Sequence, residues 1–179
     1  MLSWLSARFP TRRTARNIYG VVVAQSRLPA FYEMYGVADT PEGRFELIAL
    51  HLSLVLERLD HVGLSGRRIA QEVTEIFVID MDDNMREMGV GDLAVPAKVK
   101  RAAAGLFERA QRYRVAMSDA AAPGELAALI GLQLLSPLEG DGMATRLAGY
   151  VRQSRGELAA ISNRDILAGR IAFAGLPAA

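Results

Sequence analysis

The sequence predicts an all-α protein, a single-domain bundle of several helices with a buried central helix. Three observations support this fold class. Apolar residues recur at the three- and four-residue spacing of helices over long stretches of the chain. Proline and glycine fall between these stretches, where helices begin and end. No alternation of Val, Ile and Thr is long enough to predict a sheet.

The composition fits one globular domain and excludes several classes of function. The chain has 179 residues, 51% of them hydrophobic and 23% charged, which suffices for a substantial core. Its formal net charge of +1 gives no overall field that would attract DNA. The lack of cysteine excludes disulfides, thiol catalysis and cysteine-ligated metal. The longest apolar run, residues 47–56, is too short to span a bilayer.

The first helix is predicted from Thr14 or Arg16 to Ser26, because its apolar periodicity begins there. Pro29 suits the start of a short helix that ends at Gly36. We therefore predict two parts of the chain, a basic N-terminal arm at residues 1–16 and a helical domain at residues 17–179.

The central helix is predicted to end near Leu59. Asp39 or Thr40 can cap its start, and Pro41 suits its first position. Both sides of this segment are apolar, so we expect neighbouring helices to enclose it.

Two more long helices are predicted after it. The first is capped by Ser65 and stops at Gly89, and the second runs from Pro96 to Met117. The segment between them is a turn, for which Gly89 and Gly91 are the structural residues. We expect one continuous core from the helices at 40–59, 65–88 and 96–117.

The remaining chain is predicted to be helical with interruptions. Pro123 and Gly124 precede a helix that ends near 136–137, and residues 140–142 read as a flexible loop. A helix from Ala144 to Ile161 follows, and then one or two helical turns after Ile166.

Polar residues interrupt the apolar stripe of the predicted helix at 65–88. Asp80, Asn84 and Glu87 fall among the apolar positions that face the core. A buried polar group without a partner costs about 1–3 kcal/mol. We therefore expect at least one of the three to be partly buried and hydrogen-bonded near residues 89–93, or to face a partner.

Five segments of the chain resemble the ubiquinol–cytochrome c chaperone family, the assembly factors of the cytochrome bc1 complex. They are residues 19–27 (YGVVVAQSR), 29–32 (PAFY), 39–47 (DTPEGRFEL), 80–93 (DMDDNMREMGVGDL) and 95–100 (VPAKVK). The resemblance is strongest over residues 17–117, and the segment 80–93 is its most specific part.

This resemblance implies a non-catalytic assembly chaperone that binds newly made cytochrome b and needs no cofactor. A second assembly factor is a further expected partner. A contact with the ribosome or a membrane surface is predicted from the basic helix at 96–117, for which a solvated face is the alternative. The expected location is the bacterial cytoplasm, peripherally at the inner membrane. The alternative is the mitochondrial matrix, because the first residues are basic and free of acids.

We predict that partners bind where the helices at 65–88 and 96–117 join. The residues of this predicted surface are Asp80, Asp82, Asn84, Arg86, Glu87, Asp92, Lys98 and Lys100. Mutual pairing of the acidic and basic helices, or a solvated face, would explain the same charges without a partner.

A second predicted contact lies in the N-terminal arm. Trp4, Leu5 and Phe9 beside Arg12 and Arg13 suit a membrane interface. The alternative is an arm that packs on its own domain or stays disordered.

Two other classes of function were weighed. An all-helical lipid-, quinone- or haem-binding protein could use the apolar segment 47–56, with His51 reaching a haem iron, although a satisfied core histidine explains His51 more simply. An enzyme could use Asp80, Asp82 and Glu87, but these residues point in different directions around a helix. The spacing of Asp80, Asp82 and Asn84 lacks the later residues of a calcium loop, so no metal site is predicted.

Overall fold

The computed structural model describes residues 3–135 and 141–176, and the side chains from residue 11 onwards in these ranges except that of Asp141. This part of the chain is helical, which confirms the predicted fold class. It contains eight helices: α1 (Ser3–Ser26), α2 (Pro29–Glu33), α3 (Pro41–Asp60), α4 (Leu64–Glu87), α5 (Val95–Ala116), α6 (Glu125–Leu134), α7 (Asp141–Ala160) and α8 (Asn163–Leu167). The only β-type pairing in these ranges is an isolated bridge between Val37 and Leu135.

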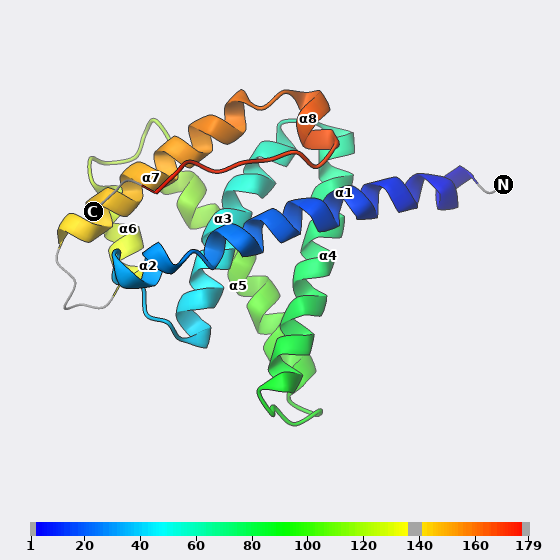
Figure 1. Ribbon diagram of the computed structural model, residues 1–179, viewed down its shortest axis with the longest axis horizontal. Coiled ribbons are helices and arrows are strands. Elements are labelled where there is room, and N and C mark those ends of the chain that lie inside the picture. Colours follow the sequence, from blue (N-terminus) through cyan, green and yellow to red (C-terminus); the bar gives the residue numbers. More distant parts are fainter. Residues whose placement is uncertain (1–2, 136–140, 177–179) are drawn as a thin grey trace.

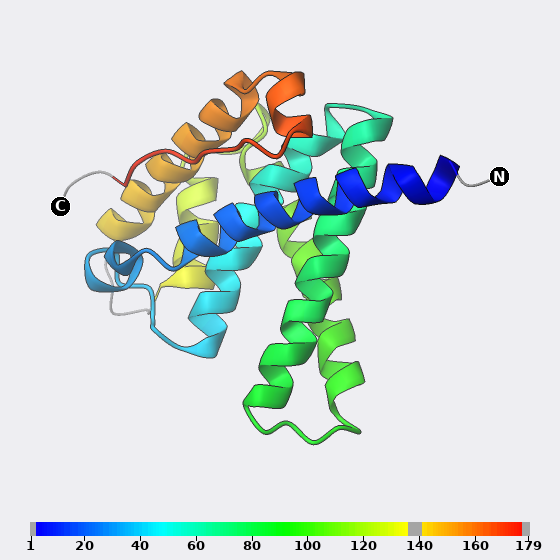
Figure 2. The same ribbon diagram turned by 45° about the vertical axis from the view of Figure 1, so that its right-hand side comes forward.

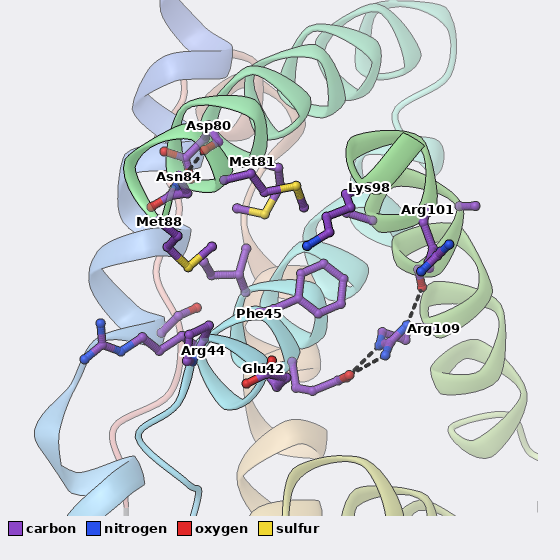
Figure 3. A pocket seen from close by; sticks show the side chains of 18 of the residues that line it. Glu42, Arg44, Phe45, Asp80, Met81, Asn84, Met88, Lys98, Arg101 and Arg109 are labelled. Atoms are coloured by element: carbon purple, nitrogen blue, oxygen red, sulfur yellow. Dashed lines mark hydrogen bonds and ion pairs between the residues drawn. The ribbon is translucent and has the colours of Figure 1, made fainter. Parts of the chain in front are cut away.

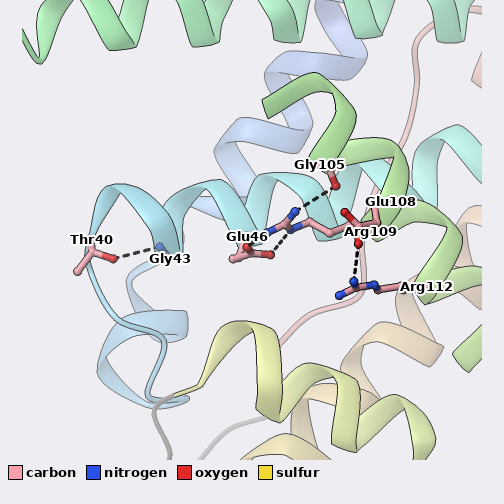
Figure 4. Close-up of polar contacts among 7 residues, drawn as sticks. All are labelled: Thr40, Gly43, Glu46, Gly105, Glu108, Arg109 and Arg112. Atoms are coloured by element: carbon pink, nitrogen blue, oxygen red, sulfur yellow. Dashed lines mark hydrogen bonds and ion pairs between the residues drawn. The ribbon is translucent and has the colours of Figure 1, made fainter. Parts of the chain in front are cut away.

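Helix α3 is the buried central helix that the sequence predicts. Thr40 caps it, since its Oγ1 accepts a hydrogen bond from the Gly43 amide at 3.1 Å, and Pro41 follows as the first residue (Figure 4). A Cβ at position 43 would lie 2.0 Å from the Ala38 carbonyl oxygen, so only glycine fits this turn. Beyond it, leucines on both sides of α3 are buried, among them Leu47, Leu50 and Leu54.

Helix α1 starts earlier than predicted. It is continuous from Ser3, not from residue 14 or 16, and its first turns project beyond α4 (Figures 1 and 2). Its second half carries the residues that pack on the body, such as Ala15, Ile18 and Val22. The apolar periodicity begins with these packed residues, so it did not predict the earlier start. The separate role of residues 1–16 stays a prediction.

Helices α4 and α5 form a hairpin that extends away from the rest of the body (Figures 1 and 2). The predicted end of α4 is confirmed, because Gly89 follows it with a φ of +76°. Its predicted start is wrong: Gly63, with a φ of +81°, precedes the first residue, and no side chain caps the helix. Glycine takes this left-handed backbone without strain, and it replaces the serine cap we expected.

The last helices close the body over α1 and α3. Helix α7 begins at Asp141, so Asp141 and Gly142 are helical and not part of a loop. Gly140 and the predicted helix end at Ser136–Pro137 lie outside the described residues. The segment after α8 returns along α7 (Figure 1), and the Ala174 amide donates to Ser154 Oγ at 3.2 Å. Buried residues of α1, α3, α4, α5, α6 and α7 form one continuous core, which confirms that prediction.

Candidate functional site

A cleft lies between α3 and the α4–α5 hairpin. Its volume is about 780 Å³, and the end of α1 contributes to one side (Figure 3). The apolar part of its lining consists of Phe45, Ile48, Met81, Met85, Met88, Val90 and Ala102. The cleft therefore offers an apolar surface that the protein's own helices leave uncovered.

Methionine dominates the α4 wall of this cleft. Met81, Met85 and Met88 follow the helical spacing i, i+4 and i+7, so they share one face of α4. Burial falls along this row, from 8% exposure at Met81 to 57% at Met88. Methionine is unbranched and polarisable, so this wall can adapt to apolar side chains of different shapes.

The floor of the cleft is held in place by an ion pair between helices. Arg109 of α5 binds Glu46 of α3 with both ends of its guanidinium, at 2.6 Å from Nε to Oε2 (Figure 4). The hydrogen bond to Glu46 raises the pKa of Arg109. The same guanidinium lies 5.0 Å from the centre of the Phe45 ring and donates to the Gly105 carbonyl. This contact fixes α5 against α3 and orients Phe45.

Three cations at the cleft have no such partner. In the described side chains, no carboxylate lies within ion-pair distance of Arg27, Lys98 or Arg101. By contrast, Arg44 pairs with Asp39 at 2.7 Å. Figure 3 shows Lys98 reaching from α5 toward Phe45 and Met81. The α5 wall therefore carries positive charge that the protein itself does not neutralise.

Polar residues at the end of α4 meet α1. Tyr19 Oη donates to Asp80 Oδ2 at 2.7 Å, and Asn84 Nδ2 donates to the Asp80 carbonyl at 2.6 Å. Burial and this hydrogen bond raise the pKa of Tyr19. The predicted partial burial is thus confirmed for Asp80 and Asn84, but Glu87 is exposed. The predicted bond near residues 89–93 is wrong, because the partner of Asp80 comes from α1.

Another residue holds the turn after α4. Arg86 pairs with Asp82 at 2.7 Å and with Asp92 at 2.6 Å. Pairing between the acidic and basic helices, the alternative explanation of these charges, is not found among the described residues, since no ion pair joins α4 to α5 there.

The structure divides the predicted partner surface in two. Asp80, Asn84 and Lys98 line the cleft. Asp82, Arg86, Glu87, Asp92 and Lys100 do not line it and lie on the outside of the hairpin. Sequence reasoning missed Met85, Arg101 and the Glu46–Arg109 pair. The methionine spacing was readable, but nothing in a single sequence links residues 46 and 109.

His51 is a core histidine whose two ring nitrogens both have hydrogen-bond partners, so the simpler interpretation of this residue is confirmed. It is fully buried, with Nδ1 2.7 Å from the Leu47 carbonyl oxygen and Nε2 2.7 Å from Tyr150 Oη. Burial lowers its pKa to about 4, although the bond to Leu47 opposes this shift. Both ring nitrogens are engaged, so His51 has none free for a haem iron.

The remaining predictions concern the N-terminus and metals. Arg12 and Arg13 are exposed, whereas the side chains of Trp4, Leu5 and Phe9 lie outside the described residues, so the membrane contact stays a prediction. No described helix is both long enough and apolar enough to cross a membrane. No group of three or more His, Cys, Asp or Glu side chains suited to a metal ion occurs in the described part.

The described helical body, with a cleft that combines apolar side chains and unpaired cations, has features typical of a binding protein. Comparison with known proteins makes this class specific. The sequence profile of the ubiquinol–cytochrome c chaperones matches residues 33–173, and the chain belongs to this family. It is therefore a chaperone for assembly of the bc1 complex.

A solved structure agrees with the family assignment. The crystal structure of the Cbp3 homolog from Brucella abortus is similar with a TM-score of 0.85 and 33% sequence identity, covering 98% of each chain. No curated protein sequence matches the chain significantly. The resemblance drawn from the sequence is confirmed, and the match extends well beyond residue 117.

Proposed function

We propose that this protein is a non-catalytic chaperone that holds newly made cytochrome b in the cleft between α3 and the α4–α5 hairpin. The observation that carries the proposal is the row Met81, Met85 and Met88, whose exposure rises from Met81 to Met88, in a member of a bc1 assembly family. A nascent membrane protein exposes apolar side chains, and the cleft offers them an apolar surface.

The size of the cleft suits reversible binding of a client. Complete burial of one large apolar side chain contributes about 1.5–3 kcal/mol. Association costs about 4–15 kcal/mol in lost freedom, so a few such contacts give a complex of moderate affinity. A chaperone must pass its client on, and moderate affinity serves that purpose.

Other parts of the surface are left for further partners. We expect a second assembly factor, or a ribosome or membrane surface, to meet the outside of the hairpin or the projecting start of α1. Arg12 and Arg13 would contribute attraction to anionic lipid there. The expected location is the bacterial cytoplasm at the inner membrane, with the mitochondrial matrix as the alternative.

A lipid- or quinone-binding protein is the second candidate, because about 780 Å³ lies within the range of small-molecule sites. Haem held by His51 is disfavoured by the engagement of both its ring nitrogens. Solvent extraction and mass spectrometry of the protein purified from its own cells would decide. A stoichiometric lipid or quinone would favour this candidate.

Two experiments test the chaperone function. Deletion of the gene should lower cytochrome b and assembled bc1 complex and leave unrelated respiratory complexes intact; normal bc1 levels would contradict the proposal. A photo-crosslinking residue at Met85 should capture cytochrome b in cells. The same residue at Ile79, an exposed position on α4 that does not line the cleft, should not.

A further inference from the structure

We propose that the cleft selects an amphipathic helix whose polar edge carries carboxylates, and that Lys98 and Arg101 bind those carboxylates. The inference rests on the proposed function, because it names the kind of client segment that the cleft takes. It depends on the shape of the apolar wall and on the distribution of charge around it.

The apolar wall has the dimensions of a helix-binding groove. Met81 lies in the last two turns of α4 and Met88 directly follows the helix, so the row covers seven residue steps, or about 10 Å at about 1.5 Å per residue. Phe45 and Ile48 of α3 face the same hollow. Helix-in-groove recognition uses apolar anchors at i, i+3 or i+4, and i+7, which match a row of this length.

The charges around the cleft are unequal once internal pairs are removed. Glu46 is neutralised by Arg109, Glu108 by Arg112, and Asp80 accepts the Tyr19 hydroxyl. Arg27, Lys98 and Arg101 remain without a carboxylate among the described side chains. Glu42 of α3 and Asp80 of α4 are the acids of the lining that remain without a cation among the described side chains. The unpaired charges on the α5 side of the cleft are therefore positive.

The two cations of α5 have the spacing that a helical partner requires. Lys98 and Arg101 are i and i+3 on α5, so they face one side of that helix, and both line the cleft. Their position beside the apolar row matches a partner helix with acids next to its apolar face. Both side chains are exposed at the edge of the cleft, and charges in such positions determine partner choice and association rate.

The position of the cations relative to the tip of the hairpin favours a peptide over a bilayer. Lys98 is exposed and extends from α5 toward Phe45 at the cleft (Figure 3). A flat lipid surface contacts projecting groups first, and the tip of the hairpin carries the fully exposed Leu93 beyond the cleft. An inserted helix reaches Lys98 without displacing the hairpin.

The test uses the purified full chain and three synthetic amphipathic peptides. The peptides share one leucine stripe and carry Glu, Gln or Lys beside it. Fluorescence anisotropy at low salt should give the Glu peptide at least about tenfold tighter binding than the Lys peptide, and added salt should reduce the difference.

Two double variants with the same change in net charge provide the comparison. Lys98→Glu with Arg101→Glu should reverse the preference. Lys100→Glu with Arg114→Glu alters exposed residues of α5 outside the cleft and should preserve it. Thermal unfolding of both variants shows that they are folded.

Each remaining outcome overturns the inference in a different way. Equal binding of all three peptides would remove the charge selection and leave apolar client binding intact. Binding of none would remove helix recognition, while the gene deletion still judges the assembly function. If reversal at Lys98 and Arg101 abolishes binding to phosphatidylglycerol vesicles but leaves peptide binding unchanged, the two cations serve a lipid surface.

Discussion

Helix α3 passes two regions that treat polar groups in opposite ways. At His51, the interior pairs both ring nitrogens and surrounds the ring with Phe31 and Phe173 at 5.5 and 4.9 Å between ring centres. Less than two turns earlier, at Phe45, the cleft leaves methionines uncovered and Lys98 without a counter-charge. The polar groups around His51 are thus hydrogen-bonded within the core. The cleft instead keeps exposed apolar and charged groups, where we propose that a partner binds.

The buried region around His51 stabilises the fold, whereas the cleft is surface that the fold leaves accessible. Loss of a buried partner leaves a polar group stranded and costs stability. Loss of a cleft residue removes surface that water already contacts, so stability changes little. Substitutions in the two regions should therefore differ in kind, and four measurements can sharpen or break the comparison.

The largest expected effect is at His51. Its replacement by alanine opens a cavity and leaves Tyr150 Oη without its acceptor, so we expect a loss of about 3–5 kcal/mol in the free energy of unfolding. Met88→Ala, in the half-exposed part of the cleft wall, should cost under about 1 kcal/mol. Urea unfolding of both variants measures the contrast, and equal costs would break it.

The second effect is a dependence of stability on pH. The folded pKa of His51 is about 4, below its ordinary value of 6.5, so between these values the unfolded chain binds a proton that the folded chain does not. Stability should be complete above pH 6.5 and fall as the pH drops toward 4, by about 3 kcal/mol in all. His51→Leu should lose this part of the slope in urea unfolding from pH 7.5 to 4.5. An unchanged slope would assign it to other groups.

The third effect lies at the boundary between the two regions. Arg109→Met removes the partner of Glu46, which is largely buried, and we expect a loss of about 2 kcal/mol. Phe45 also loses the cation over its ring, so peptide binding should weaken as well. Arg67→Met breaks the exposed pair with Asp60, outside the cleft, and is the control, with little change in melting or binding. Similar results for both variants would contradict a special role for Arg109.

The smallest effect on stability is expected outside the hairpin. Arg86→Glu and Lys100→Glu alter exposed residues, so thermal melting should stay close to that of the wild type. If this outer surface meets a partner, cytochrome b in cells should nevertheless fall, because like charges at an interface are costly. Unchanged cytochrome b would confine partner binding to the cleft. Proportionate loss of melting temperature and cytochrome b would mean that these residues are structural.

Features that depend on local sequence could be predicted, and features that depend on long-range packing could not. The apolar periodicity and the positions of proline and glycine predict α3 with its Thr40 cap and Pro41. They also predict the end of α4 at Gly89, because these signals are local. The start of α1 escapes prediction, since the apolar periodicity begins only near Ala15, where the helix packs on the body. The helical wheel identifies Asp80 as unusual, but its partner Tyr19 lies 61 residues away and only the folded chain reveals it.

The cleft was only half predictable for the same reason. Lys98, Asp80 and Asn84 stand out on their own helices, so a single sequence suffices to select them. Arg101 and Met85 gain meaning only when α3 and α5 are brought together by Glu46 and Arg109. Residues that act through long-range packing leave no signal in one sequence.

The segment after α8 bears on the order in which the chain acquires its shape during synthesis. Phe173 stacks edge-on against His51, and Ala174 binds Ser154, so residues translated after every described helix finish the surroundings of a histidine on the third. Chains emerge from the ribosome N-terminus first. The cleft residues on α3, α4 and α5 therefore exist as polypeptide well before the interior behind them is sealed. During that interval the nascent protein itself has an interior that is not yet fully closed.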